Sequence, residues 1–259
     1  MADERRAPGV ERAVSALAPV TLEALDERSA LRRRVDTKYV IERQELEPLL
    51  GSLREDYEAL EIDGERVFSY DSVYFDTPEL RCFYDHLEGR RPRFKARSRL
   101  YRETGACFFE AKVKLADDET AKRQCAYDRE SHGDMTPGAR RFLGEALAEL
   151  ADEPAPDDLA PTLSTHYRRI TLGARSGGER VTIDLAVMLQ SMDDRSVQLR
   201  DDHALVETKT ENGRSPVDEV LVAGGSEPVS LSKYRLGVGL LLADDPEGAH
   251  AEALLRCFV

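Results

Sequence analysis

Apolar and polar residues alternate strictly in several separate stretches of the chain, and a period of two predicts β-strands. The clearest stretch is residues 90–102, RRPRFKARSRLYR, where a basic residue falls on every second position from Arg91 to Arg99. The same alternation recurs in residues 32–41, 72–77, 108–115, 165–172, 180–187 and 204–211. We therefore expect at least seven strands, each with one more apolar face and one face rich in charged residues.

Apolar residues at helical spacing predict helices in other parts of the chain. The expected helices cover residues 44–60, 137–150, 232–241 and the C-terminal residues 246–259, and a polar, proline-rich connection spans residues 151–161. We expect residues 1–27 to form an N-terminal appendage with a short helix that breaks at Pro19. Residues 28–245 are then expected to form one domain.

Strands with one apolar and one charged face can use both faces in a barrel whose outside is covered by helices. An open sheet with its charged face in water would also explain the alternation. It would not explain why long basic side chains recur while carboxylates occur singly among them. We therefore predict an α+β fold, an antiparallel β-barrel with a charged interior and flanking helices.

The charge distribution narrows the choice of ligand. Charged residues make up 34% of the chain and the formal net charge is −13, so the overall field does not attract nucleic acid. Residues 90–102 nevertheless carry seven basic side chains and no acidic one. On one strand face these cations stand about 6.5–7 Å apart and repel one another unless an anion lies among them. A solvated edge strand protected by basic residues is the alternative explanation.

The motifs of several common protein classes are absent from the sequence. The four cysteines show no CxxC spacing, which argues against a zinc site or a disulfide framework and favours a reducing cytoplasm. Neither a signal peptide nor an apolar run of about 18–20 residues is present, so we expect a cytoplasmic protein without direct membrane insertion. There is no GxxxxGK[ST] loop and no GxSxG motif, and the histidines are scattered.

An interior of arginine and lysine with a few carboxylates suits a chain of phosphates. Arginine binds phosphate oxygens in bidentate fashion, and lysine contributes a compact point charge. Carboxylates repel phosphate, so their expected partner is Mg²⁺ or Mn²⁺, which binds one or two carboxylates together with substrate phosphates. Phosphoryl transfer then requires mainly positioning and charge neutralisation.

Nine motifs in order give the chain a family resemblance over residues 28–242. They are RVDTKY, SVYFDT, FKARSRLY, FFEAKVK, AKRQ, HYRRIT, RVTIDL, LVETK and LSKYRLG. The chain resembles the triphosphate tunnel metalloenzyme superfamily and, within it, the VTC (vacuolar transporter chaperone) domain in its short bacterial form. The CYTH-type branch, with triphosphatases and class IV adenylyl cyclases, opens with ExExK. Here those positions are Arg34, Asp36 and Lys38, which looks like the VTC branch, whose catalytic members make inorganic polyphosphate from ATP.

The resemblance implies roles for individual basic residues. The residues expected to act on the reacting phosphates are Lys38, Arg97, Arg99, Lys112, Arg169 and Arg180. The further residues expected to bind phosphate are Lys95, Lys122, Lys209 and Lys233. In HYRRI the role could shift to Arg168, but strand parity with Tyr167 favours Arg169.

The resemblance also implies a metal ligand. Glu207 is the expected principal ligand of Mn²⁺ or Mg²⁺. Asp184 and Glu110 are further candidates, and either could instead orient a neighbouring arginine or lysine through a salt bridge.

Three functions follow from this resemblance. The first is a polyphosphate polymerase that uses ATP, the second a tunnel triphosphatase that releases orthophosphate from triphosphate or nucleotides, and the third a non-catalytic polyphosphate-binding module. The expected partners are ATP and polyphosphate or triphosphate. Because eukaryotic members of the family work in membrane complexes, a membrane or accessory partner is a further possibility.

Overall fold

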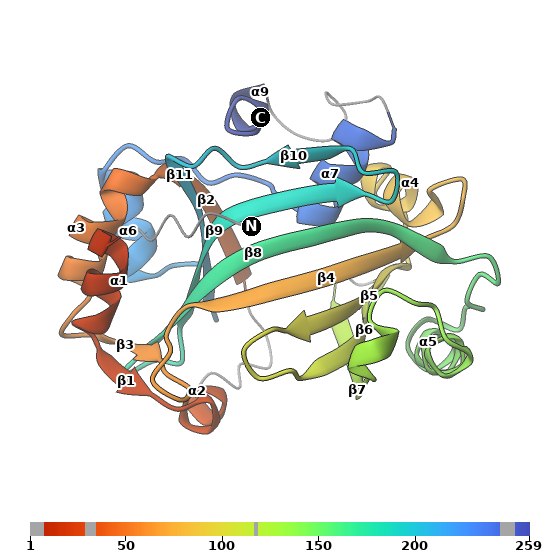
Figure 1. The fold of residues 1–259 in the computed structure, drawn as a ribbon, viewed down its shortest axis with the longest axis horizontal. Coiled ribbons are helices and arrows are strands. Elements are labelled where there is room, and N and C mark those ends of the chain that lie inside the picture. Colours follow the sequence, from red (N-terminus) through yellow and green to blue (C-terminus); the bar gives the residue numbers. More distant parts are fainter. Residues whose placement is uncertain (1–7, 29–34, 117–118, 244–251) are drawn as a thin grey trace. The chain divides into compact units, whose positions relative to one another are not determined.

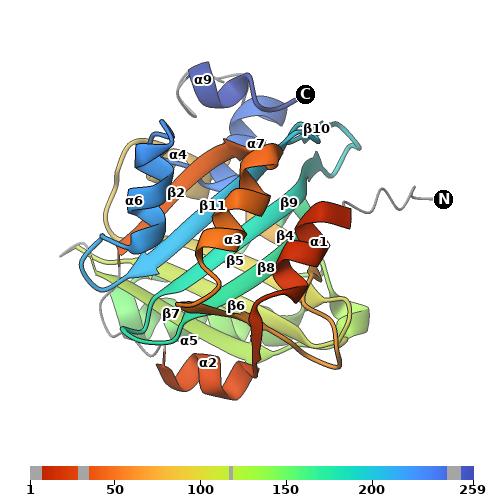
Figure 2. The ribbon, with the colours of Figure 1, turned by 90° about the vertical axis from the view of Figure 1, so that its left-hand side faces the viewer.

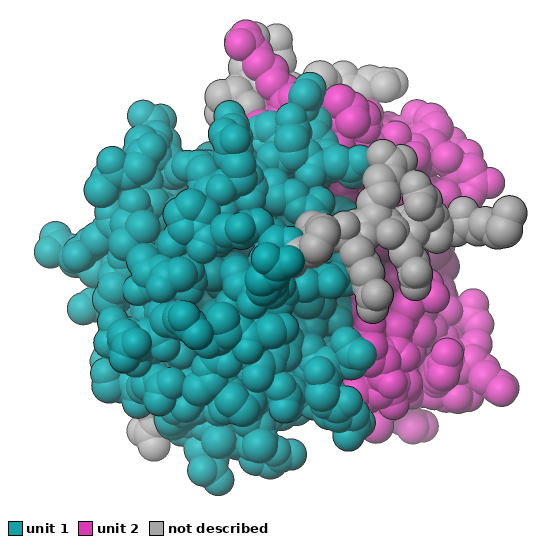
Figure 3. Space-filling view, turned by 60° about the vertical axis from the view of Figure 1, so that its left-hand side comes forward, with its two compact units in different colours: residues 1–68, 168–186, 199–230 teal, residues 69–167, 187–198, 231–259 magenta. Residues whose placement is uncertain are grey.

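The computed structural model describes residues 8–28, 35–116, 119–243 and 252–259 (Figure 1). The chain divides into two compact units, coloured separately in Figure 3. Unit 1 comprises Met1–Phe68, Arg168–Ala186 and Leu199–Ser230, and unit 2 comprises Ser69–Tyr167, Val187–Gln198 and Leu231–Val259. The long strands β8 (Ala160–Ala174) and β9 (Arg180–Ser191) contribute residues to both units.

Unit 1 is a sheet with helices on its apolar face. Besides its parts of β8 and β9, it contains α1 (Pro8–Ser15), β1 (Ala18–Val20), α2 (Leu22–Arg28), β2 (Val35–Glu42), α3 (Leu46–Ser52), β3 (Tyr57–Leu60), β11 (His203–Thr210) and α6 (Pro216–Ala223). Its strands are ordered β2-β11-β9-β8-β3, with β1 paired parallel to β3. The pairs β2–β11, β11–β9 and β3–β8 are antiparallel.

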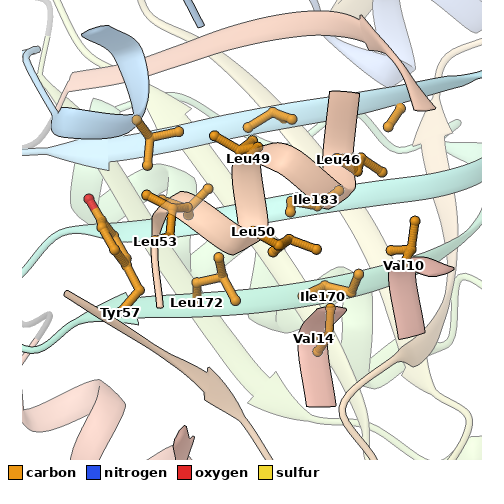
Figure 4. Close-up of a cluster of buried hydrophobic side chains, with 14 of the residues drawn as sticks. Val10, Val14, Leu46, Leu49, Leu50, Leu53, Tyr57, Ile170, Leu172 and Ile183 are labelled. Atoms are coloured by element: carbon orange, nitrogen blue, oxygen red, sulfur yellow. The ribbon is translucent and has the colours of Figure 1, made fainter. Parts of the chain in front are cut away.

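The core of unit 1 forms because alternate strand residues are apolar. Ile170, Leu172 and Ile183 point to the same face of β8 and β9 and are fully buried there. Helices α1 and α3 cover this face (Figure 2), and the leucines of α3, among them Leu46 and Leu50, pack against it (Figure 4). The charged residues of the same strands are left on the opposite face.

Unit 2 is a second mainly antiparallel arrangement. Besides its parts of β8 and β9, it contains β4 (Phe68–Asp76), α4 (Arg81–Leu87), β5 (Arg93–Tyr101), β6 (Cys107–Lys114), β7 (Thr120–Ala126), α5 (Pro137–Ala151), β10 (Ser196–Gln198), α7 (Lys233–Leu241) and α9 (Glu252–Leu255). Its strands are ordered β8-β4-β5-β6-β7, and β10 pairs with β9. The pairs β4–β5, β5–β6 and β6–β7 are antiparallel.

The core of unit 2 contains many aromatic side chains. Phe75, Phe83 and Phe109 are almost completely buried among the leucines of α5 and α7. The buried carboxylate of Asp76 accepts hydrogen bonds from the backbone N–H groups of Thr77, Cys82 and Phe83 and from the hydroxyl of Tyr234. This carboxylate therefore ties the start of α4 to α7.

The α+β fold class, with a mainly antiparallel sheet and flanking helices, is confirmed, as are the strands predicted from alternation. Within each unit, however, the strand order of the described residues does not return to its first strand, so neither unit is a closed barrel by itself. The predicted helices at 137–150 and 232–241 are α5 and α7. The short helices α4 and α6 were not predicted.

The helix predicted over residues 44–60 is wrong in its second half. Helix α3 ends at Ser52, directly after Gly51, and Tyr57–Leu60 form strand β3. These residues pair with β1 and β8, and the pairing outweighs a local preference for helix. The spacing from Leu46 to Tyr57 fitted a single helix because Tyr57 is also buried in the same core.

The N-terminal segment that we expected as an appendage contributes Val10, Val14 and Leu25 to the buried residues. It holds two helices on either side of β1 instead of one helix broken at Pro19. Arg34 lies outside the described residues, and so does most of the segment before α9. The division into one domain with two flanking segments remains a prediction. Across the described ranges, no helix is both long and apolar enough to span a membrane.

Candidate functional site

The charged face of unit 1 is built by residues that alternate with its core. The register of β11 places Glu207 opposite Lys38 of β2, and Lys209 opposite Asp36 on one side and Arg180 of β9 on the other. The residues of this unit 1 charged face are Asp36, Lys38, Arg169, Arg180, Asp184, Glu207 and Lys209. The neighbouring strands β2, β11, β9 and β8 thus bring together residues from distant parts of the sequence.

Glu207 lies between two lysines. Its Oε1 is 3.0 Å from Nζ of Lys38, and its Oε2 is 2.6 Å from Nζ of Lys209, which also lies 3.6 Å from Asp36. Burial favours the protonated form, but Lys209, Lys38 and Arg169 lower the pKa of Glu207 well below its usual value. Glu207 is therefore a carboxylate at neutral pH, available as an oxygen ligand.

The two arginines of HYRRI point to opposite faces. Arg169 makes a bidentate ion pair with Asp184, with Nε–Oδ1 and Nη2–Oδ2 distances of 2.6 and 2.8 Å. Arg168 instead reaches Glu11 of α1 at 3.1 Å. Arg169 thus lies on the charged face, as strand parity predicts. Arg180 donates to Asp26 of α2 at 2.7 Å.

Unit 2 has a basic face of its own, which lies along β5, β6 and β7. In the register, Arg97 lies opposite Glu110 on one side and Tyr74 on the other, and Lys95 lies opposite Lys112. The residues of this unit 2 basic face are Lys95, Arg97, Arg99, Glu110, Lys112, Lys122 and Lys233. The alternate residues Phe94, Ala96, Phe109, Ala111 and Val113 are buried on the other face.

Glu110 is the central carboxylate of the unit 2 basic face. It accepts hydrogen bonds from Arg97 at 2.5 Å and from Lys122 at 2.7 Å, and only 3% of it is exposed. Burial acts to raise the pKa of Glu110, but Arg97, Arg99 and Lys122 lower it far below its usual value. Burial lowers the pKa of Lys122, against the attraction of Glu110. Glu110 is thus held as an anion that fixes the position of Arg97.

Each of four cations on the unit 2 basic face lies over a tyrosine ring. Arg97 lies 5.6 Å from the ring centroid of Tyr74, and Arg99 lies 5.6 Å from that of Tyr70. The other two pairs are Lys95 over Tyr234 at 5.9 Å and Lys233 over Tyr167 at 4.6 Å. The rings of Tyr70 and Tyr167 stack at 5.3 Å. An aromatic face attracts a cation through its quadrupole without adding a negative charge.

The start of α7 is fixed to β5 by a hydrogen bond. Ser232 caps the helix by accepting from the backbone N–H of Arg235, and its hydroxyl also accepts from Nζ of Lys95 at 3.0 Å. Lys233 is the first residue of α7 and projects over Tyr167. The expected position of Lys233 at a helix start is therefore found, beside the β5 cations.

The structure separates the predicted residues into two groups. Lys38, Arg169, Arg180, Asp184, Glu207 and Lys209 are on unit 1, and Lys95, Arg97, Arg99, Glu110, Lys112, Lys122 and Lys233 are on unit 2. Their roles in binding and catalysis remain predictions. Sequence reasoning missed the supporting tyrosines. The available signal was parity, because Tyr70 and Tyr74 fall six and two residues before Asp76, on the polar face of that strand.

The two faces differ in their balance of charge. On the unit 1 charged face, Lys38, Lys209 and Arg169 each pair with a carboxylate. On the unit 2 basic face, cations outnumber Glu110, and tyrosine rings support several of them. The unit 2 basic face therefore has the chemistry to bind a multiply charged anion, and the unit 1 charged face offers both cations and carboxylate oxygens.

Within the described residues, no three histidine, cysteine, aspartate or glutamate side chains group together to hold a metal. Mg²⁺ does not need such a group, because it is commonly bound by one or two carboxylates plus substrate phosphates. Glu207 fits this ligand type because it is ionised and its ion-pair partners are two lysines, whereas arginines hold Asp184 and Glu110. The latter two have the salt-bridge arrangement that was the alternative to metal binding.

Comparisons with known proteins place the chain in a family. A family model described as the VTC domain matches residues 33–242. No curated protein matches the sequence significantly. Solved structures that match the chain at low identity include the following three. HpAC1 from Hippeastrum, reported to have a dominant triphosphatase activity, shares 16% identity with a TM-score of 0.46, over 84% of this chain and 100% of that one.

Two further matches are to a candidate cyclase and to an RNA triphosphatase. A candidate adenylate cyclase from Bacillus halodurans shares 12% identity with a TM-score of 0.47, over 77% of this chain and 94% of that one. The Pct1 RNA triphosphatase of S. pombe shares 10% identity with a TM-score of 0.28, over 75% and 77% of the two chains.

Proposed function

Because this chain belongs to the VTC domain family, we propose that it catalyses phosphoryl transfer from a triphosphate, and that the reaction is the synthesis of inorganic polyphosphate from ATP. The observation that carries the proposal is the unit 2 basic face. There Arg97 and Arg99 stand two residues apart on one strand, each over a tyrosine ring, with Glu110 as a buried anchor. This arrangement concentrates positive charge in a protein whose net charge is −13.

In the proposed reaction, a terminal phosphate oxygen of the growing chain attacks the γ-phosphorus of ATP. A new P–O bond forms, and the bond from the γ-phosphorus to the oxygen that bridges it to the β-phosphate breaks. The electron pair leaves with ADP, and the chain is one phosphate longer. The lysines and arginines bind the non-bridging oxygens and offset their mutual repulsion, which is the main requirement of this transition state.

We assign the metal to Glu207 within this proposal. A bound Mg²⁺ or Mn²⁺ would neutralise phosphate charge and act as a Lewis acid. Lys38 and Lys209 share the two carboxylate oxygens of Glu207, so a phosphate that binds these lysines would release an oxygen for the metal. Arg169, held by Asp184, is a preoriented guanidinium for phosphate oxygens.

Hydrolysis of a triphosphate is the second candidate function. It differs in that water replaces phosphate as the nucleophile, and a carboxylate base would favour it. The carboxylates of Glu207, Asp184 and Glu110 all accept from lysine or arginine and have low pKa values or bidentate partners. A terminal phosphate is already an anionic nucleophile and needs no base. The ion pairs therefore favour transfer to phosphate over transfer to water.

To test for polymer synthesis, the purified protein is incubated with ATP and Mn²⁺, and polymeric phosphate and free orthophosphate are measured together. Arg97→Ala and Glu207→Ala are the test variants. Arg123→Ala is the matched control, because Arg123 is an exposed arginine of β7 that pairs with Glu149 instead. Polymer formed by the wild type and the control, and lost from both test variants, supports the proposal.

Other results of this assay would contradict the proposed reaction or the role of Glu207 in it. Orthophosphate without polymer would identify a triphosphatase and overturn the polymerase assignment. Polyphosphate that binds in an Arg97-dependent way without any turnover would identify a binding module. Polymer synthesis that survives Glu207→Ala would remove the metal role assigned to that residue.

A further inference from the structure

Two acidic side chains are buried on the core side of the unit 1 sheet without a basic partner. Glu179, directly before β9, is 7% exposed, and Asp218 of α6 is 8% exposed. Oε1 of Glu179 and Oδ2 of Asp218 are both buried and have no hydrogen-bond partner. Within the described ranges, no lysine, arginine or histidine forms an ion pair with either group, which we call the acid pair. A buried carboxylate without a cation is costly, so the acid pair differs from Glu207 and Glu110.

The acid pair is surrounded by hydroxyl groups instead of cations. The hydroxyl of Tyr57 donates to Oε2 of Glu179 at 2.7 Å, and the hydroxyl of Thr208 donates to Oδ1 of Asp218 at 2.7 Å. Tyr57 packs in the core of unit 1 (Figure 4), where the local dielectric is low. A hydroxyl donates one hydrogen bond but has no positive charge, so these surroundings do not compensate two negative charges.

The charged and titratable groups near the acid pair do not supply a compensating cation either. They are Tyr39 on β2, Asp56 and Tyr57 at the start of β3, and Arg180 at the start of β9. The guanidinium of Arg180 pairs with Asp26 of α2. Burial is the main cause that raises the pKa of Glu179 above its usual value, and the charge of Asp218 raises it further, against hydrogen bonds from two hydroxyl groups.

The acid pair lies behind two residues of the unit 1 charged face. Thr208 stands between Glu207 and Lys209 in β11, so its side chain points to the opposite, buried face. Its hydrogen bond to Asp218 therefore joins this part of β11 to α6. A second negative charge, on Glu179, would repel Asp218 in a medium of low dielectric. The position of the strand that carries Glu207 and Lys209 thus depends on how many charges the acid pair carries.

We propose that Glu179 and Asp218 together retain one proton in the folded protein, and that this proton keeps α6 attached to β11. At higher pH the proton passes to water, the two carboxylates repel each other, and the hydrogen bond between Asp218 and Thr208 weakens. The acid pair is then a positioning element for the unit 1 charged face, and it makes that face sensitive to pH. Its effect on phosphate binding rests on the function proposed above, whereas its protonation does not.

Urea unfolding of the wild type and of Glu179→Gln from pH 4 to pH 8 tests the proton. Glutamine is neutral at every pH and still accepts from Tyr57. Because the folded pKa of Glu179 is raised, its contribution to stability is complete below the unfolded value of about 4.3 and is lost as the pH rises through the folded pKa. The unfolding constant of the wild type should therefore rise relative to that of the variant, by about tenfold for each unit of the pKa shift.

The matched control is Glu55→Gln, which neutralises an exposed glutamate of unit 1. Its unfolding constant should keep the same ratio to the wild type at every pH. A Glu179→Gln protein that loses more stability at pH 7 than at pH 4 would show that Glu179 is a stabilised carboxylate, and would overturn the proposal. A ratio for Glu179→Gln that does not change with pH would overturn it as well.

Two substitutions of Thr208 test the positioning. Valine keeps the shape of the side chain and removes the hydroxyl that binds Asp218, whereas serine keeps the hydroxyl. In calorimetric titrations at pH 7, Thr208→Val should bind inorganic tripolyphosphate about threefold or more weakly than the wild type, and Thr208→Ser should stay within about twofold. Between pH 6 and pH 8, the wild type should lose more affinity than Glu179→Gln. Circular dichroism checks that each variant is folded.

The two arms of the experiment separate the possible failures. Equal tripolyphosphate affinities for the wild type and Thr208→Val would overturn the positioning role. The same pH dependence of affinity in the wild type and in Glu179→Gln would overturn the link between the proton and the charged face. A wild-type protein that binds no tripolyphosphate at any pH would overturn the proposed function, and the unfolding arm would still decide whether the acid pair retains a proton.

Discussion

Tyr74 supports Arg97 in two ways that substitutions can separate. Its ring lies under the guanidinium, and its hydroxyl oxygen accepts a hydrogen bond from Arg97 Nη1 at 2.9 Å. The same residue is 8% exposed and packs in the core of unit 2. We infer that the tyrosines position the cations of the unit 2 basic face, so that arginines stay in place when no anion is bound.

The substitutions Tyr74→Phe and Tyr74→Leu test this positioning. Phenylalanine keeps the ring, so tripolyphosphate affinity should fall no more than about threefold. Leucine removes the ring, and the loss should reach about tenfold, since cation–π attraction is worth up to about 2 kcal/mol when desolvated. Calorimetric titration measures both. Equal affinities for the two variants would show that the ring does not position Arg97.

Glu110 allows a prediction about pH. Its folded pKa lies below its unfolded value of about 4.3, so its contribution to stability is complete above that value and is lost as the pH falls through the folded pKa. In Glu110→Gln the half-buried Arg97 loses its carboxylate partner, and the free energy of unfolding should fall by about 3 kcal/mol at pH 7. The difference from wild type should shrink as the pH approaches 3.

Urea unfolding at several pH values measures this difference. The control is Glu149→Gln, which removes a more exposed carboxylate from Arg123 and should change stability by less than about 1 kcal/mol. A Glu110→Gln deficit that is the same at pH 7 and pH 3 would contradict the assigned ionisation.

Two glycines that lie inside helices differ in the space available for a side chain. In α5, a Cβ at Gly144 would meet no atom within 4 Å, whereas in α7 a Cβ at Gly237 would come within 2.6 Å of Cδ2 of the buried Leu163. Gly144→Ala should therefore raise the free energy of unfolding by about 0.5–1 kcal/mol through helix propensity. Gly237→Ala should lower it by about 1–3 kcal/mol through overpacking.

Chemical denaturation of both variants measures these changes in the free energy of unfolding. Gly237→Ala should also weaken tripolyphosphate binding, because α7 carries Lys233 and its cap Ser232 holds Lys95. A Gly237→Ala protein that is more stable than the wild type would contradict this prediction. It would show that Leu163 moves aside at little cost.

The strands were predictable from sequence, whereas the pairing of residues across them was not. Alternation marks which residues of β5 and β6 share a face, and Arg97 and Glu110 were both identified in this way. Local spacing contains no information about register, so it could not show that Arg97 meets Glu110, or that Lys95 meets Lys112. The helix predicted through Tyr57 was wrong for a related reason. Tyr57 is buried in the sheet, but its spacing from the leucines of α3 also fits one further turn of helix.

For the whole molecule, an acidic protein with a local basic face should discriminate among polyanions. The net charge of −13 repels the parts of a polyanion that lie outside the face, and the bulk of its sugars and bases keeps more of a DNA strand outside than of a bare phosphate chain. We expect single-stranded DNA, at equal phosphate concentration, not to displace labelled long-chain polyphosphate. Fluorescence competition measures this, with unlabelled polyphosphate as the positive control. Displacement by DNA would show that the face recognises phosphate charge alone.

The family followed from motif order, because Arg, Lys and Glu recur at fixed places in nine short segments. What sequence could not supply is the difference between the two faces. Lys38 and Lys209 are paired with carboxylates, whereas on the unit 2 basic face Arg97 and Lys122 share Glu110, and tyrosine rings lie beside Arg97 and Arg99. That difference depends on contacts between residues far apart in the chain, such as Lys233 with Tyr167.

The tyrosines beneath the cations have a spectroscopic consequence. The chain has nine tyrosines and no tryptophan, so all of its intrinsic emission in the near ultraviolet comes from tyrosine and is not masked by indole. Four of the nine, Tyr70, Tyr74, Tyr167 and Tyr234, lie against the cations of one face. An anion that draws those cations away from the rings changes the surroundings of nearly half of the fluorophores. The unmodified protein therefore carries its own optical probe of phosphate binding.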